Sequence, residues 1–354
     1  MGATSVPSNS SSQWLLSVTA LRYTPSQTTS DIPLEKELYD RARGVEFLFR
    51  MGVALQLPLS ALYTAAVWFH RFYMRYSLED HHRQEVAAAC LFLATKTEEC
   101  GRKLRDVAKV LCAKTVNMSV AEIPDDYKDL EQYQNAILLT EEVLLEALCF
   151  DFVVDSPHAE LVDLFDVRQD TAELEECAWS IANDTARTPL CVLFPARIIA
   201  AACYILAQHV IEGPQSPSLD VRIASPAPSA SLPTPPSHKV VPPEASRFAI
   251  EHFGFNEVDL VSIAEVLNII LEFYAAQDLQ AATHLGPVAS IPPPRVSTSR
   301  EKLYTSFSQI NSHRHLQQSA AGGGDMNGSP ASTHGASTPG KPQSRGWKPV
   351  RGSG

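Results

Sequence analysis

The chain has 354 residues, of which 45% are hydrophobic, so it is long enough to bury one or two compact cores. Its formal charge of −11, from 29 Lys and Arg against 40 Asp and Glu, argues against direct, sequence-independent binding to nucleic-acid phosphates. The seven cysteines are odd in number and lack a CxxC spacing, which excludes a simple disulfide framework and favours buried thiols in a reducing compartment.

The first half of the chain predicts a loose start followed by five helices. Residues 1–30 are rich in Ser and Thr, and we expect a flexible segment there apart from the apolar patch Trp14-Leu15-Leu16. Asp31-Ile-Pro33 then gives a helix start signal, and Gly52 offers a stop. Apolar stripes at helical spacing predict helices near 31–52, 58–76, 84–98, 104–111 and 137–148.

The third of these predicted helices has an unusual composition. Residues 86–94 contain no charge and are rich in Ala and Cys. A helix that is apolar on all sides must be covered on all sides. We therefore expect it to lie at the centre of a helical bundle.

The second half predicts a similar arrangement with an insertion. Candidate helices cover 158–165, 174–186, 195–210, 245–253 and 258–274. Nine prolines lie between Pro214 and Pro243, a composition that predicts neither helix nor central strand. After about residue 285 the sequence turns to Gly, Ser, Pro and His, which is typical of a disordered tail. No apolar alternation of period two persists, so the predicted class is all-α.

An internal repeat links the two halves. Residues 86–99 and 199–212 share the frame AAACxxLAxxxxE, and Trp68 corresponds to Trp179. Self-similarity on this scale indicates one folding unit used twice.

Two adjacent five-helix units, each built around an Ala-rich helix, resemble the cyclin fold. The string LATKTEE at 93–99 is similar to the cyclin-box signature in which Lys-x-Glu-Glu closes the third helix. The strings at 69–74, 102–107 and 148–152 resemble those of transcription-type cyclins, namely the T, K and L types and the regulatory subunit of the fungal CTD kinase. The resemblance runs from Trp14 to Tyr274, apart from the Pro-rich loop.

The resemblance implies a domain organisation. We expect a flexible segment at 1–30, a first cyclin box at 31–154, a second at 155–280 with its Pro-rich loop at 213–244, and a disordered tail at 281–354. The tail and the Pro-rich loop are expected to lie outside both helical bundles.

The resemblance also implies a binding site. In cyclins, a Lys of the third helix and a Glu of the fifth hydrogen-bond the backbone of the partner kinase beside its αC helix, and these positions match Lys96 and Glu141. The neighbouring residues expected to contribute are Thr97, Leu145, Phe150 and Phe152. The alternative is an intramolecular salt bridge worth about 0–1 kcal/mol. In the second repeat the pair is replaced by His209 and Ala264, so the bundle does not need it, which favours the binding role.

The expected function is that of a regulatory subunit rather than an enzyme. The resemblance implies a heterodimer with a cyclin-dependent kinase that phosphorylates the C-terminal repeats of RNA polymerase II, promoting transcription elongation or mRNA processing in the nucleus. We expect no catalytic residue, cofactor or metal, and no membrane contact, because no apolar run reaches the ~20 residues of a transmembrane helix.

A general transcription factor of the TFIIB type is the alternative. It also uses two cyclin-like repeats, but binds DNA and the TATA-binding protein. That alternative predicts an N-terminal zinc ribbon and basic repeats, whereas the first thirty residues contain no Cys and the whole chain is acidic. An enzyme is a third possibility, and no catalytic constellation supports it.

Overall fold

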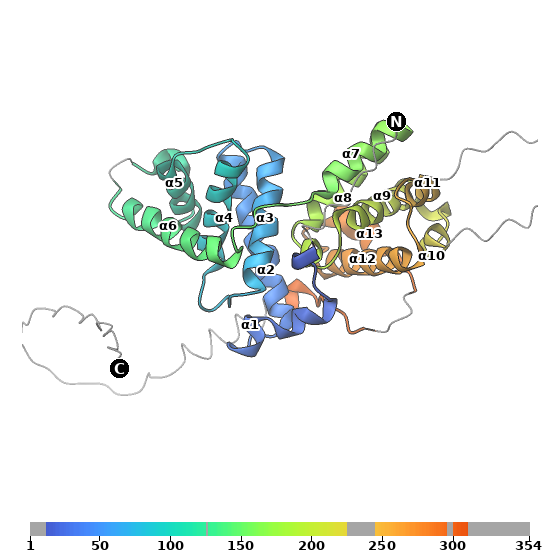
Figure 1. The fold of residues 1–354 in the computed structure, drawn as a ribbon, viewed down its shortest axis with the longest axis horizontal. Helices are drawn as coiled ribbons and strands as arrows, with labels where there is room; N and C mark the ends of the chain where they lie inside the picture. The colour runs from blue at the N-terminus through green and yellow to red at the C-terminus, as the bar shows by residue number, and fades with distance from the viewer. Residues whose placement is uncertain (1–11, 125–126, 225–244, 296–299, 311–354) are drawn as a thin grey trace, which may run out of the picture. The chain divides into compact units, whose positions relative to one another are not determined.

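The computed structural model describes residues 12–124, 127–224, 245–295 and 300–310. All of them belong to one compact unit, which runs from Met1 to Asn311. Within these ranges the regular elements are helices and no strand occurs, so the all-α prediction is confirmed (Figure 1).

The first bundle contains the five predicted helices. They are α2 (Leu34–Ala54), α3 (Leu59–Tyr73), α4 (Arg83–Thr97), α5 (Leu104–Thr115) and α6 (Leu130–Ala147). The helix α4 contacts α2, α3, α5 and α6, and its residues 86–95 are all buried. The uncharged, Ala-rich composition thus correctly indicated the central helix.

Two helix ends in this bundle differ from the prediction. The helix α2 continues through Gly52 to Ala54 instead of stopping there. The residue is glycine because a side chain at that position would collide with Leu62 of α3. Glycine is used here for close approach between helices rather than as a cap. The helix α6 begins earlier than expected, since Leu130 and Ile137 are both buried on one face.

The second bundle repeats the arrangement around α9 (Ala196–Glu212). This helix contacts α7 (Pro157–Arg168), α8 (Ala172–Thr185), α11 (Ala245–His252) and α12 (Glu257–Ala276). Inside the Pro-rich stretch, α10 (Leu219–Ile223) forms one short helix whose Leu219 and Ile223 are buried. The expectation that this stretch contains no helix is therefore wrong at 219–223, while residues 225–244 lie outside the described ranges.

The N-terminal segment is ordered over residues 12–30, contrary to the prediction of a flexible start. It contains η1 (Ser12–Trp14), η2 (Val18–Tyr23) and α1 (Pro25–Thr28). Leu21 is buried, and the Thr24 hydroxyl donates to Glu37 of α2 over 2.6 Å. Glu37 in turn accepts from the buried guanidinium of Arg41. A buried ion pair needs further hydrogen-bond donors for its spare lone pairs, and the N-terminal segment supplies them.

Part of the predicted tail is also ordered. After η6 (Thr283–Leu285) and α13 (Gly286–Ala289), residues 300–310 pack Leu303, Tyr304 and Phe307 into the core. The ring of Phe307 lies 5.0 Å from Tyr39 of α2 and 6.2 Å from Phe273 of α12, measured between centroids. We call residues 300–310 the C-terminal strap. The Ser-rich composition around these residues led to the prediction of a disordered tail, although the segment contains three buried apolar side chains. Residues 311–354 lie outside the described ranges.

The helix α2 contributes to both cores. Its N-terminal half places Leu34, Leu38, Tyr39 and Ala42 in the core of the second bundle. Its C-terminal half places Val45, Phe47, Leu48 and Met51 in the core of the first. One continuous helix therefore joins the two repeats.

Candidate protein-binding surface

Lys96 and Glu141 form an ion pair between the last turn of α4 and the second half of α6. The ammonium of Lys96 donates to both carboxylate oxygens, with distances of 2.6 and 2.9 Å. The Lys96 side chain is 47% exposed, whereas that of Glu141 is 9% exposed. The ammonium also lies 4.1 Å from the ring centroid of Phe92, one turn earlier on α4. The carboxylate therefore anchors the lysine at the surface of the bundle.

The pair retains hydrogen-bonding capacity towards a partner. An ammonium has three N–H donors, and two of them are taken up by Glu141. The remaining donor of the half-exposed Lys96 can reach a carbonyl of another chain. A charge-assisted hydrogen bond of this type is stronger than one between neutral groups.

Thr97 is exposed at the end of α4, whereas Leu145 is partly covered. The Thr97 hydroxyl donates back to the Ala94 carbonyl of its own helix over 3.3 Å. Leu145 is half-buried and packs against the core of the first bundle. Of these two expected contributors, Leu145 supplies apolar area and Thr97 has its hydroxyl engaged within α4.

Phe150 is presented by an unusual end of α6. The Cys149 amide donates to the Glu146 carbonyl and the Phe150 amide to the Leu145 carbonyl, which is the Schellman pattern of helix termination. Cys149 and Phe150 both have positive φ, 52° and 57°, although neither is glycine. Left-handed conformations cost L-residues about 1–2 kcal/mol each. This strained turn directs Phe150 outward, where it is 65% exposed.

Phe152 connects the exposed ring to the core. Its ring packs edge to face against Phe150, at 6.3 Å, and against the fully buried Trp68, at 5.8 Å. Phe152 therefore connects the exposed Phe150 to the buried Trp68 of the first bundle.

Two exposed residues of α6 were missed by the sequence interpretation. Leu138 and Leu139 are 44% and 65% exposed and precede Glu141 by three and two residues. The signal was present, because Ile137-Leu138-Leu139 is an apolar run too wide for one buried face at 100° per residue. Only Ile137 of the three is buried. Leu138, three residues before Glu141, lies on the same side of α6 as the ion pair, whereas Leu139 points to another side of the helix.

The ordered N-terminal segment borders this surface. Trp14 donates to the Asp151 carboxylate over 3.0 Å, and Arg71 lies over the Trp14 ring. Partial burial alone would raise the pKa of Asp151, but hydrogen bonds from Trp14, the Val153 amide and Gln13 hold it below its ordinary value. The carboxylate is thus held ionised beside Phe150.

Comparisons with known proteins find similarity to cyclins. Residues 13–153 match the model described as "Cyclin, N-terminal domain". The chain is 42% identical to cyclin pch1 of Schizosaccharomyces pombe over 207 residues, which cover 57% of this chain and 60% of that protein. Residues 13–153, less than half of the chain, are thus similar to the N-terminal domain of cyclins.

Further similarities are of the same kind. The chain is 32% identical to cyclin-K of Danio rerio over 198 residues, which are 55% of this chain and 45% of that protein. It thus spans about half the length of these curated relatives. A chain of the yeast RNA Pol II CTD kinase CTDK-1 complex has the same fold, with a TM-score of 0.54, 18% identity, and coverage of 90% of this chain and 86% of that chain.

Proposed function

We propose that this protein is a cyclin, the regulatory subunit of a cyclin-dependent kinase that acts on the C-terminal repeats of RNA polymerase II. In this role it promotes transcription elongation or mRNA processing in the nucleus and performs no chemistry itself. Its kinase-binding residues are Lys96, Glu141, Thr97, Leu145, Phe150 and Phe152. The described helices include none that is long and apolar enough to cross a membrane.

The observation that carries the proposal is the combination of charge and apolar area at the end of α4 and α6. The half-exposed Lys96 is anchored by Glu141, and exposed Leu138 and Phe150 lie on or directly after the same helix α6. Interfaces gain affinity from buried aromatic and aliphatic anchors, and register from hydrogen bonds. The relatives named cyclin pch1 and cyclin-K, and the CTD kinase named for the structural neighbour, favour the transcriptional branch.

Activation follows from preferential binding to one kinase conformation. A kinase is active when the Glu of its αC helix pairs with the strand Lys that contacts the ATP phosphates. A cyclin that binds beside αC in this inward position shifts the population towards it. Moving such an equilibrium from 1:99 to 99:1 requires about 5.5 kcal/mol of differential affinity.

A charge swap separates a binding role from a purely structural ion pair. Lys96→Glu combined with Glu141→Lys keeps two opposite charges in contact, so we expect unfolding free energy to change by about 1 kcal/mol or less. The partner would then meet a carboxylate where it needs a donor, and binding should weaken by about tenfold or more. Co-purification of the kinase, identified by mass spectrometry, and its activity on CTD-repeat peptides measure the effect.

A second ion pair of the chain provides the control. Arg43 pairs with Glu46 on α2, with a cation about as exposed as Lys96 and a more exposed carboxylate, and the swap Arg43→Glu with Glu46→Arg should leave kinase binding unchanged. If the swap at 96 and 141 preserved kinase activation, the ion pair would be structural only and the proposed interface would be wrong.

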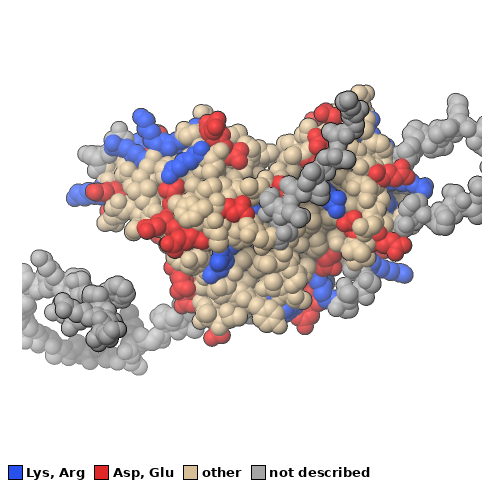
Figure 2. Space-filling view, in the orientation of Figure 1, with Lys and Arg blue, Asp and Glu red and all other residues tan. Residues whose placement is uncertain are grey.

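The TFIIB-type alternative is not favoured. The family match and the relatives carry cyclin names. On the face shown in Figure 2, Lys and Arg gather over the α5 end, while Asp and Glu occupy several separate groups. This face offers no continuous basic surface of the kind that a nucleic-acid backbone requires.

A further inference from the structure

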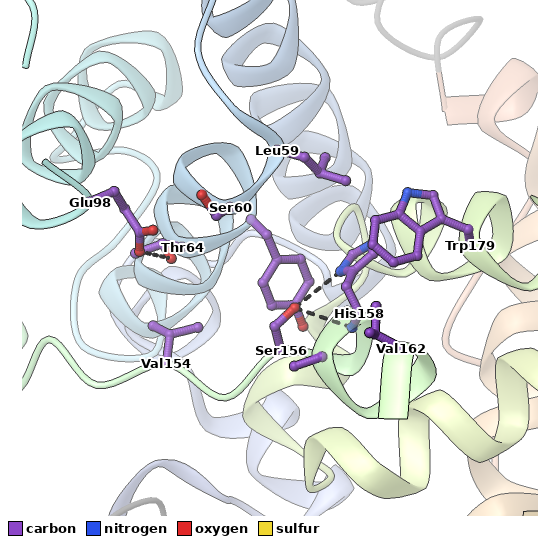
Figure 3. Close-up of a pocket in the computed structure, with 11 residues that line it drawn as sticks. Leu59, Ser60, Thr64, Glu98, Val154, Ser156, His158, Val162 and Trp179 are labelled. Atoms are coloured by element: carbon purple, nitrogen blue, oxygen red, sulfur yellow. Dashed lines mark hydrogen bonds between the residues drawn. The ribbon is translucent and has the colours of Figure 1, made fainter. Parts of the chain in front are cut away.

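A cavity of about 400 Å³ opens between the two bundles, away from the ion pair of α4 and α6. Its walls come from the first half of α3, the end of α4, the linker before α7, and from α7 and α8. Figure 3 shows Glu98 and Thr64 on one side of the cavity and Trp179 and Val162 on the opposite side. Leu59 and Val154 add apolar wall between them. The cavity therefore combines an apolar lining with a carboxylate at one end.

Trp179 also borders a second cavity. This one measures about 360 Å³ and is lined by Phe165, Glu175, Glu176, Ser180 and Asn183 in addition to Trp179. Trp179 lines both cavities, and we call them together the Trp179 groove. An elongated pair of cavities suits an extended peptide better than a compact small molecule.

The internal repeat makes the exposure of Trp179 informative. Its counterpart Trp68 is fully buried and is covered by Phe152. Trp179 packs against His158, at 4.6 Å between ring centroids, and remains half-exposed. The same helix position is thus filled in the first bundle and left bordering open space in the second.

The charged side chains that line the Trp179 groove are all acidic. Its lining includes Glu98, Glu175 and Glu176, and among the described residues it contains no Lys or Arg. The Glu98 carboxylate accepts from Thr64 over 2.8 Å. In the part of the chain that the structure describes, none of these three carboxylates forms a salt bridge. Unpaired carboxylates beside an aromatic ring attract a cation.

The neighbouring helix α7 reinforces this field. Burial is the main cause of the raised pKa of Glu160; Asp163 and Asp155 raise it further, and Arg197 and His252 offset this in part. Glu160, Asp163 and Asp155 thus place three carboxyl groups on and just before α7. A ligand that brings positive charge would relieve the repulsion between them.

We propose that the Trp179 groove docks an extended peptide of a protein partner through an apolar side chain flanked by Lys or Arg. The apolar side chain enters the cavity between Leu59, Val154 and Val162 and packs against Trp179. The flanking cations contact Glu98 at one end and Glu175 and Glu176 at the other. This site extends beyond the proposed kinase interface, and its test does not require the kinase.

Panning a phage-displayed library of random 12-residue peptides against the full chain tests the proposal. Enriched peptides should carry an apolar residue with Lys or Arg within a few positions, and their binding should weaken as salt rises. A fluorescein-labelled synthetic copy of the most enriched peptide then gives affinities by fluorescence polarisation.

Matched variants locate the binding. Val162 and Val167 are both exposed on α7, but only Val162 lines the groove. Val162→Asp should weaken peptide binding by about tenfold, and Val167→Asp should change it by less than about twofold. On α8, Glu176→Gln should weaken binding by about three- to tenfold, whereas Glu173→Gln, outside the lining, should have no effect.

Four outcomes would overturn the proposal. They are the absence of enriched peptides, enriched peptides without Lys or Arg, equal effects of Val162→Asp and Val167→Asp, and a dimer in sedimentation experiments that Val162→Asp dissociates. The last outcome would assign the groove to a second copy of the chain. The charge swap at Lys96 and Glu141 should leave peptide affinity unchanged, so failure of the proposed function is distinguishable from failure of this one.

Discussion

At the scale of single residues, His70 links the two bundles through a neutral imidazole. Its Nε2–H donates to the Ala186 carbonyl over 3.0 Å, and Arg41 donates to the His70 carbonyl. Burial, together with the positive charge of Arg41, lowers the pKa of His70 to about 3, and the hydrogen bond to Ala186 offsets this only in part. Folding therefore requires His70 to be uncharged.

This pKa predicts a pH dependence of stability. Because the unfolded chain binds a proton near pH 6.5 and the folded chain does so only near pH 3, stability falls as the pH drops through this interval. Between pH 7 and pH 5 the loss should be about 2 kcal/mol. Urea unfolding at both pH values, for the wild type and His70→Gln, measures it. Identical pH dependence in the two proteins would contradict this assignment.

Cys149 offers a second prediction at this scale. We expected buried thiols, and this is correct for Cys90, Cys112 and Cys203, but Cys149 is exposed. It occupies the left-handed position of the α6 terminus, where glycine has no steric cost. Cys149→Gly should raise the unfolding free energy by about 0.5–1 kcal/mol.

A glycine elsewhere in the same helix is the control. Ala147→Gly, in the last turn of α6, should lower stability by about 1 kcal/mol. Thermal unfolding distinguishes the two changes. Destabilisation by Cys149→Gly would contradict this prediction, because the lost contact in which Arg75 donates to the Cys149 thiol would then outweigh the relief of the positive φ.

At the scale of elements, the C-terminal strap connects helices of both repeats. Phe307 packs against Tyr39 of α2, and Tyr304 packs against Phe273 of α12. The Leu303 amide donates to Glu272 over 2.8 Å, and Arg300 pairs with Glu265 and Glu272. The strap therefore covers apolar surface that the helices alone leave open.

Truncating a strap ring should reveal its contribution. Phe307→Ala should lower the unfolding free energy by about 2–3 kcal/mol, below the range for a central core Phe because the site lies at the edge of the core. The exposed Thr305→Ala is the control and should cost less than about 0.5 kcal/mol. Urea denaturation measures both. Equal midpoints for Phe307→Ala and the wild type would mean that the strap is not held in solution.

Helix positions could be predicted because each long helix carries its own apolar stripe. The central helices α4 and α9 were recognisable from their uncharged Ala-rich runs. The N-terminal segment and the strap could not be predicted, because their stability comes from partners distant in sequence. Glu37 lies thirteen residues from Thr24, and Tyr39 is in the first half of the chain while Phe307 is near its end. Local composition carries no signal for such contacts.

At the scale of the whole molecule, the sequence predicted the internal repeat better than it predicted the binding surface. The sequence indicated two bundles but not that α2 serves both cores, since one helix face changes partner along its length. Lys96 and Glu141 form an ion pair within the chain, so the two residues of the expected site lie side by side. Their role in kinase binding stays a prediction. Leu138 and Leu139 show that exposure of apolar residues depends on neighbouring helices as well as on spacing.

Hydrogen–deuterium exchange of the purified protein, alone and with a co-purified kinase, tests the central claim most directly. We predict that the kinase slows exchange at the end of α4, in α6 and in residues 148–153, and leaves α9 and α12 unchanged. Unaltered exchange around Lys96 and Glu141, with protection confined to the second bundle, would contradict the account.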